Sequence, residues 1–395
     1  MANDYSAVSH WRSAFDESSL QKWAEDLRSQ LSASRVSLGL VFMTPKFFPH
    51  AAQVLEILRV HAQIPLLVGC SSTGLITGAE EVEEEAGLAL GLFHLPGADL
   101  LAHRFTQEKV EEAEGPDFWH AQTGVGQEQV NGWLVFADPF HLDCDSWLKH
   151  WNEAYARVPV LGGLASGELS EQRTQIYLNG EVYEDGGVAI AFRGEVALAG
   201  VISQGCTPIG ETWTITRAER NLIHEIGNRP AYEVLVETFN SLSEAEQKKA
   251  RGNLFVGLVI NEYLEEFRRG DFLIRNLLGA DPNSGCIAVG AFPRTGQTLQ
   301  FQRRDAAAAT EDLSALLESA RKRLGGKAIL GGCLCCCNGR GARLFGRASH
   351  DATAVQELLG PFGLAGFFCN GEIGPVGDRS FLHGYTASLA LFLKK

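Results

Sequence analysis

The residues best suited to chemistry lie in one stretch near the C-terminus, GFFCNGEIGPVGDRSFLHGYTA, which covers residues 366–387. Its first half reads as a strand that ends in an Asn-Gly pair at Asn370, and Glu372 follows directly. His383 and Tyr385 stand on the returning apolar run, and two residues of spacing on a strand would give them a common face. Asn-Gly is a strong turn signal, so one interpretation is a plain hairpin. The other is a ligand site, with Glu372 accepting from a cationic group and His383 and Tyr385 donating.

A second Asn-Gly pair ends the run GGCLCCCNGRG, with Cys337 before it and Arg340 after it. A guanidinium group can fork onto a carboxylate through two hydrogen bonds. Two partners stay open for Arg340: Glu372, in a structural pair, or the carboxylate of a ligand. An amino acid would suit both groups, with its carboxylate on Arg340 and its ammonium on Glu372. Cys337 ends its strand beside this arginine, where a cation favours thiol reactivity.

Small polar residues also gather at two earlier glycine-rich bends, in VGCSSTGLI and VLGGLASG. Hydroxyl groups at such bends either bind a ligand or satisfy backbone groups of the bend itself. The predicted ligand site therefore takes five residues from the N-terminal half of the chain: Cys70, Ser71, Ser72, Thr73 and Ser166.

The cysteine-rich run invites a metal interpretation, which its spacing does not favour. Cys333, Cys335 and Cys337 alternate, so on a strand they share one face while Cys336 points the other way. Zinc sites favour C-x-x-C knuckles, and a straight strand does not let its thiols converge on one ion. We expect buried, reduced thiols without a metal or a disulfide.

Catalysis by a cysteine would require a base. Cys70 or Cys337 could be the nucleophile, and His350 or His383 could be the base, but the sequence does not place them together. The chain lacks a G-x-S-x-G elbow, an H-E-x-x-H pair and a Walker loop. The expectation is a protein that is not an enzyme, and a thiol-dependent hydrolase or transferase remains an alternative.

The polar bends lie at the ends of repeated segments. The run that starts at Val41 matches the run that starts at Val135, 94 residues later. A third relative includes Gly366, offset by 204 from Gly162, and AILGGCLCCCNGRG reads as a partial fourth copy. Each copy combines a helix with short buried strands that end in a bend. We expect the two 94-offset copies to be related by a pseudo-twofold, with the bends around a shared cavity.

These patterns predict an α/β fold with mixed sheets, helices packed outside them, and internally duplicated helix–strand units. Four ranges organise the chain. They are N-terminal helices in 1–34, a domain with the two copies in 35–215, a helical connection in 216–249 and a C-terminal domain in 250–395.

Composition restricts the possible partners and compartments. The chain has 395 residues, of which 45% are hydrophobic, and a net charge of −14. Nucleic acids and anionic membranes attract basic proteins, so neither is expected as a partner. No apolar run approaches the ~20 residues of a membrane span, and the N-terminus does not resemble a signal peptide. Nine cysteines, an odd number, favour reduced thiols and a cytoplasmic location.

Four segments together resemble the FIST domain family, in its N-terminal and C-terminal halves: VGCSSTGLI, VLGGLASG, CNGRG and GFFCNGEIGP…FLHGYTASLALF. The resemblance covers roughly residues 35–390. It implies an intracellular sensory or signal-transduction protein that binds a small ligand such as an amino acid.

Members of this family are often attached to histidine kinases, chemoreceptors or cyclic-di-GMP enzymes. Here the FIST-like region fills the chain, so we expect signalling through a partner in trans, such as a histidine kinase. No cofactor is expected. Some bacterial members resemble haem-dependent nitric-oxide sensors, so a haem-bound sensor with an axial histidine is the alternative.

Overall fold

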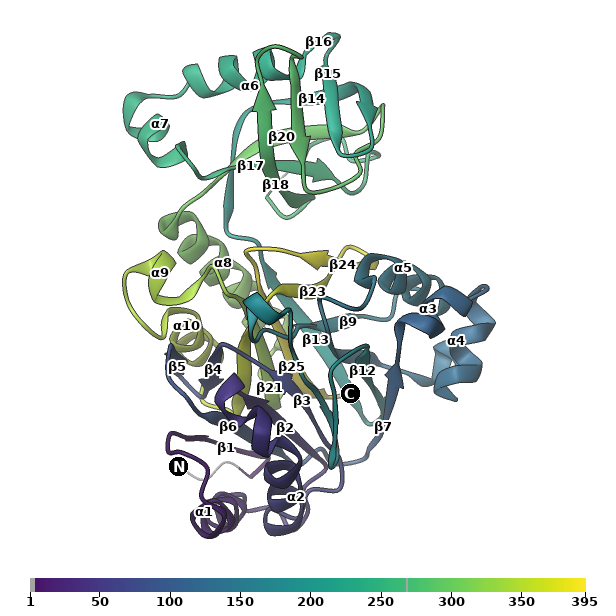
Figure 1. Ribbon diagram of the computed structural model, residues 1–395, viewed down its shortest axis with the longest axis vertical. Helices are drawn as coiled ribbons and strands as arrows, with labels where there is room; N and C mark the ends of the chain where they lie inside the picture. Colours follow the sequence, from purple (N-terminus) through teal and green to yellow (C-terminus); the bar gives the residue numbers. More distant parts are fainter. Residues whose placement is uncertain (1–3, 268) are drawn as a thin grey trace. The chain divides into compact units, whose positions relative to one another are not determined.

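The computed structural model describes residues 4–267 and 269–395 and divides into two compact units (Figure 1). The first unit combines Met1–Ile202 with Ser314–Lys395, and the second unit is Ser203–Leu313. The second unit is therefore an insertion in the chain of the first, whereas the sequence suggested consecutive ranges. In the described part of the chain, no helix has both the length and the apolar character of a membrane span.

The first unit is built from three copies of one arrangement, each with an edge strand, a central strand, a helix, a parallel strand, a hairpin and a closing strand. The first copy has β1 (Ser6–Trp11), β2 (Leu38–Met43), α2 (Ala51–His61), β3 (Leu67–Ser71), β4 (Gly74–Thr77), β5 (Glu80–Glu83) and β6 (Leu88–Phe93). The second copy has β7 (Ala98–Phe105), β8 (Gly132–Ala137), α5 (Cys144–Ala154), β9 (Val160–Leu164), β10 (Ile176–Leu178), β11 (Glu181–Tyr183) and β12 (Gly187–Gly194). The third copy has β13 (Val196–Ser203), β21 (Ile329–Cys337), α10 (His350–Leu359), β22 (Leu364–Cys369), β23 (Gly371–Val376), β24 (Arg379–His383) and β25 (Ala387–Lys394).

The three copies exchange their hairpins in a closed cycle. The sheets have the orders β1-β6-β2-β3-β10-β11, β24-β23-β9-β8-β12-β7 and β13-β25-β21-β22-β4-β5. Each sheet therefore borrows the hairpin of another copy, and no copy can complete its sheet alone. The predicted duplication and the mixed α/β class are confirmed. The pseudo-twofold was wrong because three copies, not two, complete one another, and the suspected fourth copy is β21, the central strand of the third.

The pairing of the parallel strands fixes which bend residues correspond. Gly69, Gly162 and Gly366 lie opposite Val41, Val135 and Leu334, respectively. Counting four residues onward from these glycines gives Thr73, Ser166 and Asn370 as the equivalent positions, each followed by a glycine. The 94-residue offset of the sequence pairs Ser72 with Ser166, so the structure shifts the first bend by one residue.

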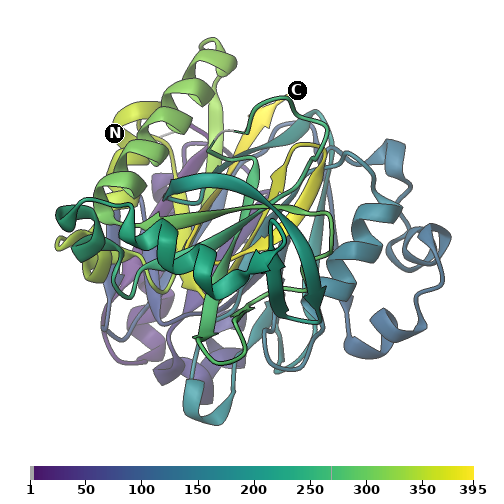
Figure 2. The same cartoon turned by 90° about the horizontal axis from the view of Figure 1, so that it is seen from above.

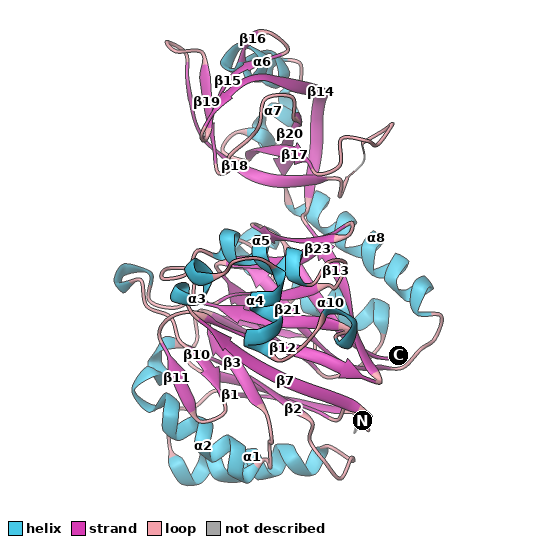
Figure 3. Ribbon diagram, turned by 90° about the vertical axis from the view of Figure 1, so that its right-hand side faces the viewer, coloured by secondary structure: helices cyan, strands magenta, loops and turns pink. Residues whose placement is uncertain are grey.

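Apolar residues on the inner faces of the three sheets form one core. Phe42, Phe136 and Phe367 meet there, with ring centroids 4.6–5.7 Å apart. The helices cover the outer faces, as α1 (Glu17–Gln30) and α2 do beside β2 and β6 (Figure 3). Residues 1–34, expected to be helical, contain the edge strand β1 before α1. The remaining short helices of this unit are η1 (Pro45–His50), α3 (Gln107–Glu112), α4 (Pro116–Thr123), η2 (Gln127–Gln129), η3 (Leu169–Glu171) and α9 (Gly341–Phe345).

The second unit has a seven-stranded antiparallel sheet of order β14-β20-β17-β18-β19-β15-β16. A further pairing of β14 with β15 closes the sheet, and α6 packs on its apolar side (Figure 2). The range 216–249, expected to be a helical connection, contains the end of β14, β15 and β16 before its helices. The elements are β14 (Cys206–Glu219), β15 (Leu222–Ile226), β16 (Arg229–Pro230), α6 (Ala231–Asn240), α7 (Glu244–Ala250), β17 (Leu254–Val259), β18 (Phe272–Asp281), β19 (Cys286–Val289) and β20 (Thr298–Arg304). Helix α8 (Ala306–Leu324) begins in the second unit, and its residues from Ser314 onward belong to the first.

Candidate functional site

The bends that end the parallel strands meet at one surface of the first unit. Thr73 Oγ1 donates to Asn338 Oδ1 at 2.9 Å, and Asn338 Nδ2 donates to Asn370 Oδ1 at 2.7 Å. Ser166 joins from the second copy, because its Oγ accepts from the Thr73 backbone N–H at 2.9 Å. Thr73 and Asn370 are exposed, and Asn338 is half-buried. We call Thr73, Asn338 and Asn370 the bend surface. Asn338 is not among the ligand residues predicted from the sequence.

The other hydroxyls of the first bend point inward. Ser71 Oγ donates to the Ser166 carbonyl at 2.8 Å, and Ser72 Oγ donates to the Phe368 carbonyl at 2.9 Å. Both serines are fully buried, so they hold the three copies together and do not face solvent. Cys70 lies in the apolar core, where burial and, to a smaller extent, Cys333 raise the pKa of its thiol.

Arg340 lies fully buried beneath the bend surface and pairs with Asp351. Its Nε donates to Asp351 Oδ2 at 2.6 Å and its Nη2 to Oδ1 at 3.0 Å, the bidentate geometry expected of a strong pair. A third bond, 3.4 Å long, joins Nη1 to the Tyr385 carbonyl. Burial lowers the pKa of Arg340, but the attraction of Asp351 outweighs it and holds the group charged. The bidentate partner of Arg340 is therefore Asp351 and not Glu372, the structural partner suggested by the sequence.

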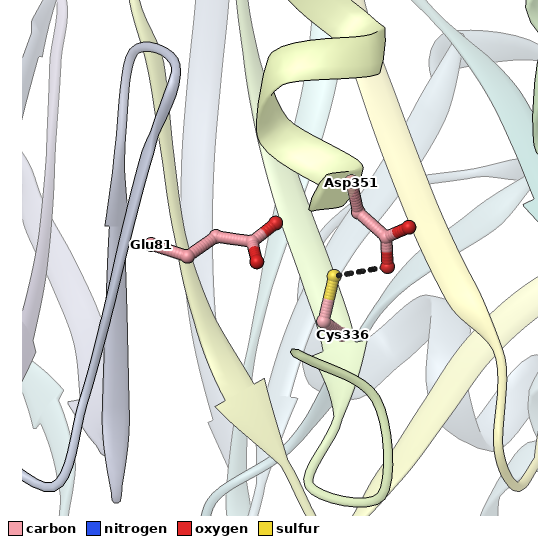
Figure 4. Close-up of side chains that lie close together, drawn as sticks. All are labelled: Glu81, Cys336 and Asp351. Atoms are coloured by element: carbon pink, nitrogen blue, oxygen red, sulfur yellow. Dashed lines mark hydrogen bonds between the residues drawn. The ribbon is translucent and has the colours of Figure 1, made fainter. Parts of the chain in front are cut away.

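Further polar groups surround Asp351 at the start of α10 (Figure 4). His350 Nδ1 lies 2.9 Å from Asp351 Oδ1, and the Cys336 thiol donates to Oδ2 at 3.6 Å. Glu81 reaches this place from β5 of the first copy, and its Oε1 accepts from the Ala352 N–H at 2.7 Å. Burial and then the Asp351 charge raise the pKa of Glu81 to about 7. The hairpin exchange thus adds a second acid, Glu81, beside the buried pair of Arg340 and Asp351.

Among the described residues, Glu81, Cys336 and Asp351 place ligand atoms within 4.8 Å of one another, close enough for a metal ion. Two features favour protons there instead. Burial and then Asp351 raise the pKa of the Cys336 thiol well above its usual value, and both oxygens of Asp351 already accept from Arg340. Cys333 and Cys335 share the opposite face of the strand, as predicted, with their Sγ atoms 4.0 Å apart. The expectation that they bind no metal stays a prediction.

The remaining predicted residues lie below and beside the bend surface. Glu372 is fully buried, accepting from the Cys369 thiol at 3.1 Å and from the Thr386 N–H at 2.9 Å. His383 is buried opposite Glu372, with Nε2 3.0 Å from the Gly374 carbonyl. Tyr385 does not share its strand face, because β24 ends at His383 and Tyr385 sits in a turn with φ of 62°. Cys337 is half-buried at the end of β21.

The buried thiols are poorly suited to nucleophilic chemistry. Burial raises the pKa of Cys335 and Cys369 well above the usual value, as it does for Cys70 and Cys336. A nucleophilic cysteine needs the thiolate, which these environments disfavour.

We expect Glu81→Gln to remove a pH dependence from the stability of the protein. The pKa of Glu81 is raised from 4.5 to about 7 in the folded state, so the folded protein holds this proton more tightly than the unfolded chain. Its contribution to stability is complete below pH 4.5 and falls as the pH rises to 7, by about 3 kcal/mol. Urea unfolding of the variant should therefore lack the decline that the wild type shows between pH 5 and pH 8.

The matched control is Glu85→Gln, an exposed carboxylate next to the same strand. This control should keep the wild-type pH profile. Identical profiles for all three proteins would show that Glu81 titrates normally and would contradict the expected effect.

Comparisons with known proteins agree with the sequence resemblance. The FIST N domain matches residues 37–229, and the FIST C domain matches residues 231–375. An uncharacterized protein of Mycobacterium bovis is 36% identical over 370 residues, which cover 94% of each chain. A second one, from Mycobacterium tuberculosis, is 35% identical over the same shares. One from Methanocaldococcus jannaschii is 21% identical over 64% of this chain and 49% of its own.

Among solved structures, cyanuric acid hydrolase from A. caulinodans matches 99% of each chain with a TM-score of 0.35 and 9% identity. That likeness is too distant to support an argument about function. FIST domains are sensory, signal-transduction domains. The two domain matches cover most of the chain, and the chain belongs to the FIST family.

Proposed function

We propose that this FIST protein is a cytoplasmic sensor that binds a small ligand, an amino acid or another carboxylate metabolite, on the bend surface. The observation that carries this proposal is the convergence of Thr73, Asn338 and Asn370, from two copies, in one exposed hydrogen-bonded chain. Ordinary turns satisfy their own backbone groups, whereas these side chains present hydroxyl and carboxamide groups to solvent.

The chemistry of the surface suits a zwitterion. The carboxamides of Asn338 and Asn370 offer N–H donors for a carboxylate and oxygens for an ammonium group. Beneath them, Arg340 is matched by Asp351, and Glu372 adds a second buried carboxylate. This excess of acid favours the ammonium end of the ligand. Arg340 then acts as a positioning residue, because its Nε and Nη2 are already bound to Asp351.

The hairpin exchange gives ligand binding a route to a signal. A ligand on the bend surface would touch residues of the first and third copies, with Ser166 of the second bound to Thr73. Tighter binding to one arrangement of the copies would shift the population toward it. We propose that a partner in trans, such as a histidine kinase, reads that shift.

A thermal-shift screen with the twenty amino acids and simple dicarboxylates such as succinate tests the proposal. A ligand at 100 times its Kd should stabilise the protein by about 2.7 kcal/mol. Asn370→Ala and Asn338→Ala should each weaken binding of the active compound at least tenfold. The matched control is Asn240→Ala, an exposed asparagine of the second unit, which should bind like the wild type. Unchanged affinity in both bend variants would show that the surface is only a set of turns.

A further inference from the structure

A separate polar cavity of 520 Å³ lies in the second copy of the first unit. It is lined by β11 and the loop after it, the end of β7, the start of α3 and the loop that follows β8. Its polar residues are Arg104, Gln107, His141, Tyr183, Glu184 and Asp185. None of them belongs to the bend surface. The volume is sufficient for a small organic molecule.

His141 is held in place from behind by a buried carboxylate. Asp138 is fully buried, and its Oδ2 accepts from the His141 backbone N–H at 2.5 Å and lies 3.0 Å from His141 Nδ1. Its Oδ1 accepts from Thr174 Oγ1 at 2.6 Å. The carboxylate favours the tautomer with its proton on Nδ1, so Nε2 is left as the acceptor of the ring. The His141 side chain is 54% exposed, so a ligand can reach it.

The position of His141 corresponds to that of Arg340 in the third copy. Counting from the paired central strands, His141 lies three residues after Asp138, and Arg340 lies three residues after Cys337. In both copies a buried aspartate fixes the side chain at this position. The third copy keeps it buried, whereas the second turns it toward a cavity.

Acidic groups outnumber basic groups around this cavity. Arg173 donates twice to Glu184 Oε1, at 2.8 and 2.7 Å, and these bonds leave Oε2 open to a ligand. Arg104 is paired with Asp185, and its guanidinium lies 4.1 Å from the centre of the Tyr183 ring. Arg173 interacts with Glu168, Glu171 and Glu184, and Arg104 interacts with Asp185. A further acid, Asp138, lies behind His141.

We propose that this cavity binds a small organic cation that carries a primary ammonium group. The three N–H donors of an ammonium group match Glu184 Oε2, His141 Nε2 and the Asp185 carboxylate, all of which are acceptors. Glu184 and Asp185 each bind an arginine through one oxygen, so the second oxygen of each carboxylate supplies the attraction. This site uses no residue of the bend surface, so the proposed cation site can be tested independently of the ligand proposed for the bend surface.

Calorimetry with 1,4-diaminobutane at low ionic strength tests the assignment, with 1,4-butanediol as the neutral compound of the same length. We expect the wild type to bind the diamine at least tenfold more tightly than the diol. Glu184→Gln keeps the shape and removes the charge, and it should weaken diamine binding at least tenfold. The matched control is Glu225→Gln, since Glu225 is also paired with an arginine, Arg217, at 3.0 Å but lies in the second unit.

Three results would overturn the assignment. The first is equal affinity for the diamine and the diol, and the second is unchanged affinity in Glu184→Gln. The third is tight binding of Zn²⁺ that displaces the diamine and is lost in His141→Ala, because the cavity would then be a metal site. Loss of diamine binding in both His141→Ala and Glu184→Gln, with Glu225→Gln unchanged, would support it.

Discussion

Asp351→Ala should destabilise the first unit by about 3–5 kcal/mol, one of the largest losses expected for any single side chain of this protein. Asp351 supplies both oxygens that hold Arg340, and both residues are at most 1% exposed. Without the carboxylate, a charged guanidinium would stay buried with no partner of opposite charge at hydrogen-bond distance. The penalty for that desolvation is the source of the loss.

Urea unfolding followed by tryptophan fluorescence measures this effect in the correct unit. Trp213 is the tryptophan of the second unit, and the other six lie in the first. The pH should be well above 4, because Asp351 has its pKa held low. Burial raises that pKa, but Arg340 and then His350 outweigh burial. The contribution of Asp351 is therefore present above the ordinary pKa of an aspartate and is lost as the pH falls.

The double variant Arg340→Met with Asp351→Leu distinguishes the cost of an unpaired buried charge from the cost of lost packing. If the loss comes from an unpaired charge, removing both partners should recover much of it. Arg217→Ala, which breaks an exposed pair with Glu225, should cost less than about 1 kcal/mol. A double variant as unstable as Asp351→Ala would show that packing, and not charge, sets the cost. The same reasoning means that Arg340→Ala disturbs the fold as well as any ligand site.

The sequence indicated the repeat because its markers are local. The prolines and glycines that match between the run starting at Val41 and the run starting at Val135 are required by turns and close strand contacts within each copy. The third copy was recognised only in part because the second unit is inserted between its edge strand β13 and its central strand β21. The insertion separates strands of one sheet along the chain, and no local sequence pattern reveals that they belong together.

The candidate site, like the repeat, could be predicted only in part. The bends of Thr73, Ser166 and Asn370 carry glycine and small polar residues, so they could be found by composition. The buried residues Asp351 and Glu81 could not be found in this way. Asp351 begins a helix like many other acids, and Glu81 arrives from another copy through the hairpin exchange. Asn338 could have been found, because it belongs to the same Asn-Gly signal as Asn370.

We expect Gly162→Ala to lower the stability of the first unit about as much as Asp351→Ala, because of a close backbone contact. Where β8 and β9 run side by side, Gly162 faces Val135, and a Cβ at this position would overlap the Val135 carbonyl oxygen. Gly162 also has φ of +140°, which L-residues with a side chain rarely adopt. Overpacking costs about 1–3 kcal/mol when side chains can move aside. Here the obstacle is a backbone atom of the core, so we expect a loss above about 3 kcal/mol.

Gly69 and Gly366 occupy the equivalent positions in the other two copies. Their alanine variants test whether every copy needs a glycine at this position. A Cβ at either would overlap the carbonyl oxygen of the facing residue, Val41 or Leu334, so their alanine variants should also lose stability. Gly384→Ala is the matched control in the same unit, because a Cβ there meets nothing within 4 Å. Unfolding in urea, followed by tryptophan fluorescence, should rank the three strand variants far below this control. If Gly162→Ala were as stable as Gly384→Ala, the close strand contact would not explain why all three copies carry a glycine there.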